Sequence, residues 1–262
     1  MSADFPEPQP GDIPPAVPVA RPVLPPEPAS VGGRDLLMGV AIIWCVELSL
    51  GVAAGFTMGF QASLTGQDLP TDLAMGLPAM WICALTLASN AGAAVVCWYF
   101  LCRKYDRSVT EGFALGPRPV SSYVICILVG ALAAFLGAVV LGFGSTGESP
   151  LAEMVSTPEG LTAFTIIALV VPLFEELYYR GFLFPILSKT LGASWGVLIV
   201  TLWFGGVHSF QLAGDWIGIP IVMAMGLIWT LQRHYTGSLL PSILTHWTYN
   251  ACLIALGYLA QE

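Results

Sequence analysis

The stretch IIALVVPLFEELYYRGFLFPIL, from Ile166 to Leu187, decides the fold class of this chain. It is long and apolar enough to cross a bilayer as a helix, which takes about 20 residues. Glu175, Glu176 and Arg180 interrupt it. An ionisable side chain at the bilayer centre costs about 3 kcal/mol on insertion scales, so such residues are rare and mark functional sites. We therefore expect this helix to turn its charged residues toward the interior of a membrane bundle.

The whole chain has the composition of a polytopic membrane protein. Of its 262 residues, 56% are hydrophobic and 10% are charged, whereas a soluble domain has about 25% charged residues. In lipid the backbone must satisfy its own hydrogen bonds, which favours helices. The sequence predicts an all-α membrane bundle of about seven (six to eight) transmembrane helices, with spans near 36–60, 73–101, 121–143, 161–187, 193–212, 216–233 and 237–259.

The polar parts of the chain exclude some functions and indicate an orientation. Although the net charge is −8, no basic stripe is present, so we expect no nucleic-acid partner. The six cysteines form no CxxC pair and are interpreted as small apolar residues.

Lys and Arg concentrate in cytoplasmic loops of membrane proteins. In this chain the basic residues occur before the first predicted span and after the second, fourth and sixth spans. This distribution predicts a cytoplasmic N-terminus. The residues are Arg34, Arg103, Lys104, Arg107, Arg118, Lys189 and Arg233.

The three charged residues of the fourth span have different helical positions. Glu176 and Arg180 are four residues apart and share a helix face, so we expect them to form a supporting ion pair. Glu175 points about 140° away from Arg180 at 100° per residue. It has no local partner, and burial raises a carboxylate pKa toward the range that suits a general base. Two break points, Pro172 and Gly181, lie within this span.

Two later spans add one histidine each to this constellation. Phe204 and His208 are four residues apart in LWFGGVHSF, and His246 and Asn250 are four residues apart in SILTHWTYNACL. Hydrolysis of an acyl bond needs a base for water and donors for the developing oxyanion. Glu175 with His208 could supply the first, and His246 with Asn250 the second. Taken singly, each of these residues could equally be a hydrogen-bonded bundle residue.

In their order along the chain, these residues resemble a known motif set. EELYYRG at 175–181, FGGVH at 204–208 and HWTYN at 246–250 are similar to the EExxxR, FxxxH and HxxxN motifs of the CPBP family, which comprises CAAX prenyl endopeptidases and bacteriocin-processing or immunity (Abi) proteins. The resemblance covers about 121–262. It implies endopeptidase chemistry inside the membrane, with Glu175 and His208 activating water.

The same resemblance implies the remaining roles and leaves the cofactor open. His246 and Asn250 would stabilise the oxyanion, while Glu176 and Arg180 support the site. The family is commonly labelled metalloprotease, and one Glu with two His can form a catalytic zinc site. If a divalent metal is present, its ligands are expected to be Glu175, His208 and His246; a metal-free mechanism is slightly favoured.

These observations predict a division of the chain and a location. Residues 1–33 are rich in proline and are expected to form a disordered tail. Residues 34–120 would hold two leading transmembrane helices and a cytoplasmic loop, and 121–262 the peptidase core. The expected location is a bacterial plasma (inner) membrane, with a membrane-associated peptide or protein as substrate. The sequence leaves the oligomeric state open.

Two other function classes compete with the peptidase. A non-catalytic family member could bind a membrane protein or give immunity, although the intact motifs argue for turnover. A transporter or proton relay could use the same buried carboxylates, but no internal repeat supports it. Loss of cleavage on changing Glu175 distinguishes the peptidase from the first, and flux in proteoliposomes tests the second.

Overall fold

The computed structural model describes residues 31–65, 77–144, 150–209, 212 and 215–259, and the regular structure of these residues is entirely helical. Most of the proline-rich tail predicted at 1–33 lies outside the described residues. The helices follow one another as α1 (Gly33–Thr65), α2 (Ala79–Leu101), η1 (Arg103–Tyr105), α3 (Val109–Gly112), α4 (Val120–Gly144), α5 (Pro150–Val155), α6 (Pro158–Glu176), η2 (Leu177–Leu183), α7 (Phe184–Leu191), α8 (Ala193–His208), α9 (Gly218–Thr236) and α10 (Leu240–Leu259).

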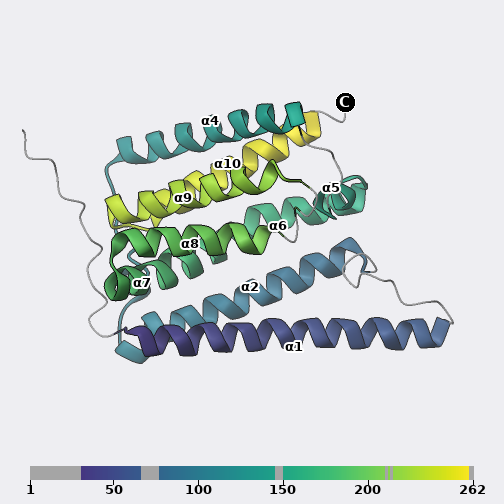
Figure 1. Cartoon of the computed structure of the whole chain (residues 1–262), viewed down its shortest axis with the longest axis horizontal. Coiled ribbons are helices and arrows are strands. Elements are labelled where there is room, and N and C mark those ends of the chain that lie inside the picture. The colour runs from purple at the N-terminus through teal and green to yellow at the C-terminus, as the bar shows by residue number, and fades with distance from the viewer. Residues whose placement is uncertain (1–30, 66–76, 145–149, 210–211, 213–214, 260–262) are drawn as a thin grey trace, which may run out of the picture.

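The long helices lie side by side as layers of an elongated bundle (Figure 1). The helix pairs α1 with α2, α2 with α6, α8 with α9, and α10 with both α4 and α6 are in contact. The connections through η1 and α3, from α7 to α8, and from α9 to α10 lie at one end of the bundle, and α5 lies at the other (Figure 1). The connections at the first end are the ones in which the sequence concentrates Lys and Arg.

The predicted fold class, an all-α membrane bundle, is confirmed. Within the residues that the structure describes, four helical stretches are long and apolar enough to cross a membrane: 33–64, 79–105, 120–142 and 158–191. Helix α8 is apolar but has only 16 residues. Polar residues that are buried in the protein, Arg233 and His246 among them, interrupt the apolar sequences of α9 and α10. The other helices of the bundle therefore cover the polar residues of these two helices and separate them from lipid.

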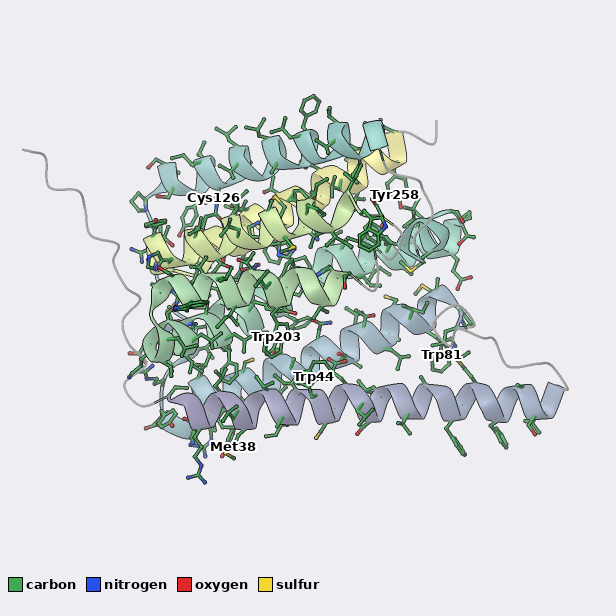
Figure 2. The ribbon with its side chains drawn as sticks, viewed as in Figure 1. Met38, Trp44, Trp81, Cys126, Trp203 and Tyr258 are labelled. Atoms are coloured by element: carbon green, nitrogen blue, oxygen red, sulfur yellow. The ribbon has the colours of Figure 1, made fainter. Side chains whose placement is uncertain are left out.

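Helix α4 packs on α10 through small residues and turns large apolar ones outward (Figure 2). Cys126 and Ala134 are buried, and Gly130 lies directly against the α10 backbone. Small residues at helix contacts in membranes let two backbones approach closely, which increases van der Waals packing. The exposed side of the same helix carries Ile125, Leu128, Leu132, Phe135 and Leu136, as expected for a surface that faces acyl chains.

Replacing Gly130 with alanine is expected to loosen the contact between α4 and α10. A Cβ at this position would lie 2.7 Å from the carbonyl oxygen of Thr245 and 2.9 Å from Cβ of Thr248, so one of the helices must shift. Overpacking of this kind costs about 1–3 kcal/mol. Thermal unfolding of purified Gly130→Ala should show a lower Tm than wild type. Gly142→Ala is the control on the same helix, since nothing lies within 4 Å of its Cβ; equal Tm values for the two variants would contradict the close packing.

Polar contacts attach the two leading helices to each other. Asp35 at the start of α1 accepts hydrogen bonds from Lys104 and Tyr105, which follow α2. Halfway along the pair, Ser89 of α2 donates to Glu47 of α1. Helix α2 in turn packs against α6. The leading helices therefore form a layer beside the helix that carries Glu175 and Glu176.

Candidate active site

A helical hairpin brings Glu175 and His208 to the same level of the bundle. Helices α6, η2 and α7 follow one another up to Leu191, and the chain reverses at Gly192, whose φ of 91° suits glycine. Glu175 lies 17 residues before Gly192, and His208 lies 16 residues after it. Residues at equal distances from a hairpin turn face each other along antiparallel helices. The predicted span 193–212 placed His208 near the far surface, but α8 ends at His208 and is only about 24 Å long at 1.5 Å per residue.

The Glu175 carboxylate lies between the two histidines. Its Oε1 is 3.7 Å from Nε2 of His208, and its Oε2 is 3.7 Å from Nε2 of His246. The side chains of Glu175 and His208 retain 17% and 19% exposure, whereas that of His246 retains 4%. The structure thus brings together three of the four predicted catalytic residues, from α6, α8 and α10. Each oxygen–nitrogen distance exceeds a direct hydrogen bond, which leaves the space beside the carboxylate to a bridging molecule.

Hydrogen bonds assign the tautomers of the two imidazoles. Nδ1 of His208 is 2.8 Å from the carbonyl oxygen of Phe204, and Nδ1 of His246 is 3.0 Å from Oε1 of Glu176. Both partners accept hydrogen bonds, so both Nδ1 atoms carry hydrogen. Nε2 of a neutral His208 is therefore an acceptor directed at Glu175. Nε2 of His246 faces the other Glu175 oxygen; it carries no hydrogen in the Nδ1–H tautomer and becomes a donor only when the ring is protonated.

Glu176 and Arg180 form a fully buried ion pair, as their spacing predicted. Nη1 of Arg180 donates to Oε1 of Glu176 over 2.9 Å, and neither side chain is exposed. The other guanidinium nitrogens bind α9: Nη2 donates to the carbonyl of Gly226 at 2.9 Å, and Nε to the hydroxyl of Thr230 at 3.2 Å. Each nitrogen of the guanidinium thus has an acceptor, which is what a buried charge requires. The pair orients His246 through the shared Oε1 atom.

The segment that carries Arg180 is a π-helix, Leu177–Leu183, rather than a break in the chain. The wider π-turn is common at functional sites and changes the directions of side chains relative to an α-helix. Pro172 lies inside α6, which continues through it. Neither candidate break point therefore ends the helix, but Gly181 lies within the π-helical segment. A Cβ at Gly181 would lie 2.9 Å from Cδ1 of Phe113, which leaves no room for a larger residue.

Aromatic rings enclose the polar cluster. Phe204 lies under the Arg180 guanidinium at 4.6 Å and contacts His208 with ring centroids 4.4 Å apart. Trp229 stacks on His246 with centroids 3.6 Å apart and planes 18° apart. Trp229, Gly226 and Thr230, which contact the cluster from α9, belong to none of the three motifs. Their contribution depends on the tertiary packing of α9, which no local motif reveals.

Asn250 binds the backbone of α6. Its Nδ2 donates to the carbonyl of Ala168 over 2.9 Å, about two helical turns before Glu175. In an α-helix this carbonyl would accept from the N–H four residues later, but that residue is Pro172, which has none. The Asn250 amide therefore replaces the missing donor. The described contacts do not join Asn250 to the histidines or to Glu175.

This contact makes a prediction about stability. Asn250→Ala leaves the Ala168 carbonyl without a partner, which costs about 1–3 kcal/mol. Pro172→Ala restores the backbone N–H, so removing Asn250 in that background should cost much less. Thermal unfolding of the four proteins of this double-mutant cycle measures the coupling. Equal costs of Asn250→Ala in both backgrounds would show that the amide does not compensate for Pro172.

The cluster does not have the arrangement that a metal ion needs. Among the residues that the structure describes, no group of three His, Cys, Asp or Glu side chains could hold a metal ion as arranged. The two Nε2 atoms face different oxygens of Glu175 rather than one common point. The predicted ligand set Glu175, His208 and His246 is therefore not arranged around one point in this conformation, and metal dependence stays a prediction for experiment.

Comparison with known proteins places this site in a family. Residues 157–252 match the family model of type II CAAX prenyl endopeptidases, Rce1-like. This match is consistent with the CAAX protease family that the three motifs resemble. The match is narrower than the predicted core 121–262, but it contains every residue of the three motifs. Neither the curated proteins nor the solved structures gave a match.

The match supports a function of the CAAX-type intramembrane protease kind, which implies a membrane-embedded peptide as substrate. The apolar helices together with this family show an integral membrane protein. Helices α1, α2, α4 and α5 lie outside the match. The site is thus built entirely within the matched segment.

Proposed function

We propose that this protein is an intramembrane endopeptidase that hydrolyses a peptide bond in a membrane-associated peptide or protein. The observation that supports this most strongly is the position of the Glu175 carboxylate, 3.7 Å from Nε2 of both His208 and His246. Side chains from three helices converge there in a partly open cluster, surrounded by aromatic residues. Such a cluster can activate water and stabilise negative charge side by side.

Glu175 and His208 activate the water. A water molecule beside the carboxylate donates one hydrogen to Glu175 and the other to Nε2 of His208, which is an acceptor in its Nδ1–H tautomer. Glu175 takes the proton as the water oxygen attacks the carbonyl carbon of the scissile bond. The new C–O bond forms while the carbonyl π electrons move to oxygen. The protonated Glu175 then gives its proton to the leaving amine as the C–N bond breaks.

His246 stabilises the oxyanion. In its protonated form Nδ1–H donates to Glu176 and Nε2–H is directed toward the Glu175 side of the cluster. A charged donor in a site with little water stabilises a developing oxyanion far more than it would in solution. Asn250 has a second N–H on Nδ2 beyond the one that binds Ala168, and we propose it as the second donor. Glu176 and Arg180 hold His246 in place.

We further propose the orientation and location that the sequence indicates. The connections with most of the Lys and Arg residues lie at one end of the bundle (Figure 1), and this end would face the cytoplasm of a bacterial plasma membrane. Residues 34–120 would form the leading helices and 121–262 the peptidase core. A reporter enzyme that is active only outside the cytoplasm should then be active when it is fused after residue 262.

Cleavage of a quenched-fluorescent prenylated CAAX peptide by the purified, reconstituted protein tests this function. His208→Ala should reduce kcat by about 10²–10⁴, because the water loses the hydrogen-bond acceptor that positions it for proton transfer to Glu175. His234→Ala is the matched control, because His234 lies in α9 against Phe184, outside the cluster. Equal turnover in His208→Ala and wild type would reject the proposed water activation.

Chelation separates this mechanism from a metal-dependent one. Since the proposed steps need only Glu175, His208, His246 and water, dialysis against a strong chelator should leave the rate of peptide cleavage unchanged. The measurement is the initial rate before and after dialysis, with total zinc determined in the same sample. A rate that falls with chelation and returns with added Zn²⁺ would require a metal ion at the cluster.

A further inference from the structure

A second group of buried cations lies at the Lys- and Arg-rich end of the bundle, away from Glu175. Arg233, in the last two turns of α9, is 2% exposed. Its Nε donates to the carbonyl of Arg180 over 3.2 Å, but its Nη1 is buried without a hydrogen-bond partner. Nε of the half-buried Arg118, just before α4, is likewise buried and unpartnered.

Backbone contacts bring these two arginines into one neighbourhood. The segment that precedes α4 packs on the turn between α9 and α10: Oγ of Ser238 donates to the carbonyl of Gly116 over 2.8 Å, and the N–H of Leu239 donates to the carbonyl of Ala114 over 3.0 Å. The N–H of Arg118 is held by the hydroxyl of Tyr123 at 2.8 Å. These contacts hold the segment that carries Arg118 against the end of α9 that carries Arg233.

Within the described part of the chain, no carboxylate balances this pair. Ion pairs in this part join, for example, Lys104 with Asp35, Arg180 with Glu176, and the two site histidines with Glu175 and Glu176, and none of these involves Arg118 or Arg233. A buried cation without a counter-charge costs several kcal/mol, and two neighbouring cations repel each other as well. Buried guanidinium donors are normally bonded. Two neighbouring guanidinia with open donors therefore match an anion with several acceptor oxygens.

We propose that Arg118 and Arg233 bind a phosphate group. A phosphate presents several oxygens, so it can accept from both guanidinia at once. Arg118 is half-buried and gives access from the surface, whereas Arg233 closes the inner side. At this end of a membrane bundle the phosphate has two possible sources, the headgroup of an anionic lipid or free phosphate from the cytoplasm. The proposal does not depend on the peptidase mechanism.

Binding of short-chain phosphatidylglycerol to the full-length protein, reconstituted in phosphatidylcholine nanodiscs, tests the site. Native mass spectrometry gives Kd, and thermal unfolding gives the shift in Tm. Arg118→Gln should raise Kd at least about tenfold, since charge-assisted hydrogen bonds are lost, and should abolish the Tm shift. Arg103→Gln, which removes an exposed arginine in the same part of the sequence, should leave both values unchanged. Arg118 is half-buried at the surface, so its replacement should leave the protein folded.

Inorganic phosphate distinguishes the two sources. If millimolar phosphate neither raises Tm nor displaces the lipid, the ligand is a lipid headgroup; if it does both in wild type but not in Arg118→Gln, the ligand is the free anion. Either result supports the site. The proposal is overturned if Arg118→Gln binds lipid and phosphate as wild type does, or if Arg103→Gln loses as much affinity as Arg118→Gln.

Discussion

Glu175→Gln should abolish peptide cleavage by the purified protein and leave it folded. Glutamine has the shape of glutamate but cannot take a proton from water, so the loss should reach about 10³-fold or more in kcat, within the range for a general base or above it. The substitution removes no contact of the buried Glu176–Arg180 pair. Circular dichroism and the Tm should therefore resemble wild type, while the initial rate of cleavage of the prenylated peptide falls to background.

The matched control for this experiment lies on the same helix. Glu159 is exposed in the first turn of α6, and Glu159→Gln makes the same chemical change without touching the cluster. It should retain the wild-type rate. Retained cleavage in Glu175→Gln, or an equal loss in Glu159→Gln, would remove Glu175 from the mechanism.

Arg180→Met should destabilise the protein more than either Gly130→Ala or Asn250→Ala. It leaves the fully buried Glu176 without its guanidinium partner, and breaking a buried pair from one side costs about 3–5 kcal/mol. It also removes one hydrogen bond to the carbonyl of Gly226, which still accepts from the Thr230 hydroxyl, and the guanidinium hydrogen bond to that hydroxyl. The expected result is a large fall in Tm in thermal unfolding of the purified protein in detergent.

A second variant separates charge from packing. In Glu176→Gln/Arg180→Met both charges are gone, so the double variant should be more stable than Arg180→Met alone, and the coupling energy follows from the double-mutant cycle. Arg103→Gln, which changes an exposed arginine, should have little effect. A double variant that is less stable than Arg180→Met would show that the pair contributes through packing and not through charge.

The broad architecture could be predicted from the sequence because membrane burial imposes strong constraints. A long apolar run must be helical, and a charge inside it must find a partner, so the Glu176–Arg180 pair could be inferred from spacing alone. The three motifs likewise led to a family that the comparison confirms for 157–252. Each of these inferences rests on local sequence and on the cost of polarity in lipid.

Features that depend on three-dimensional register were not accessible from sequence. The predicted span 193–212 continues past His208, whereas α8 ends at this residue, so the level at which His208 meets Glu175 could not be inferred from the predicted span. The π-helix around Arg180 has no clear sequence signature. The contact of Asn250 with Ala168 could have been suspected from Pro172, since a proline frees the carbonyl four residues before it, but the identity of the donor depends on how α10 packs on α6.

Imidazole ¹⁵N NMR of the protein labelled only at histidine tests the convergence on Glu175 most directly. The chain has three histidines, two of them beside Glu175 and the third, His234, packed against Phe184. We expect Glu175→Gln to shift the ¹⁵N resonances and the titration of His208 and His246 while those of His234 stay in place. Unchanged His208 and His246 resonances in the folded variant would contradict a carboxylate shared by the two rings.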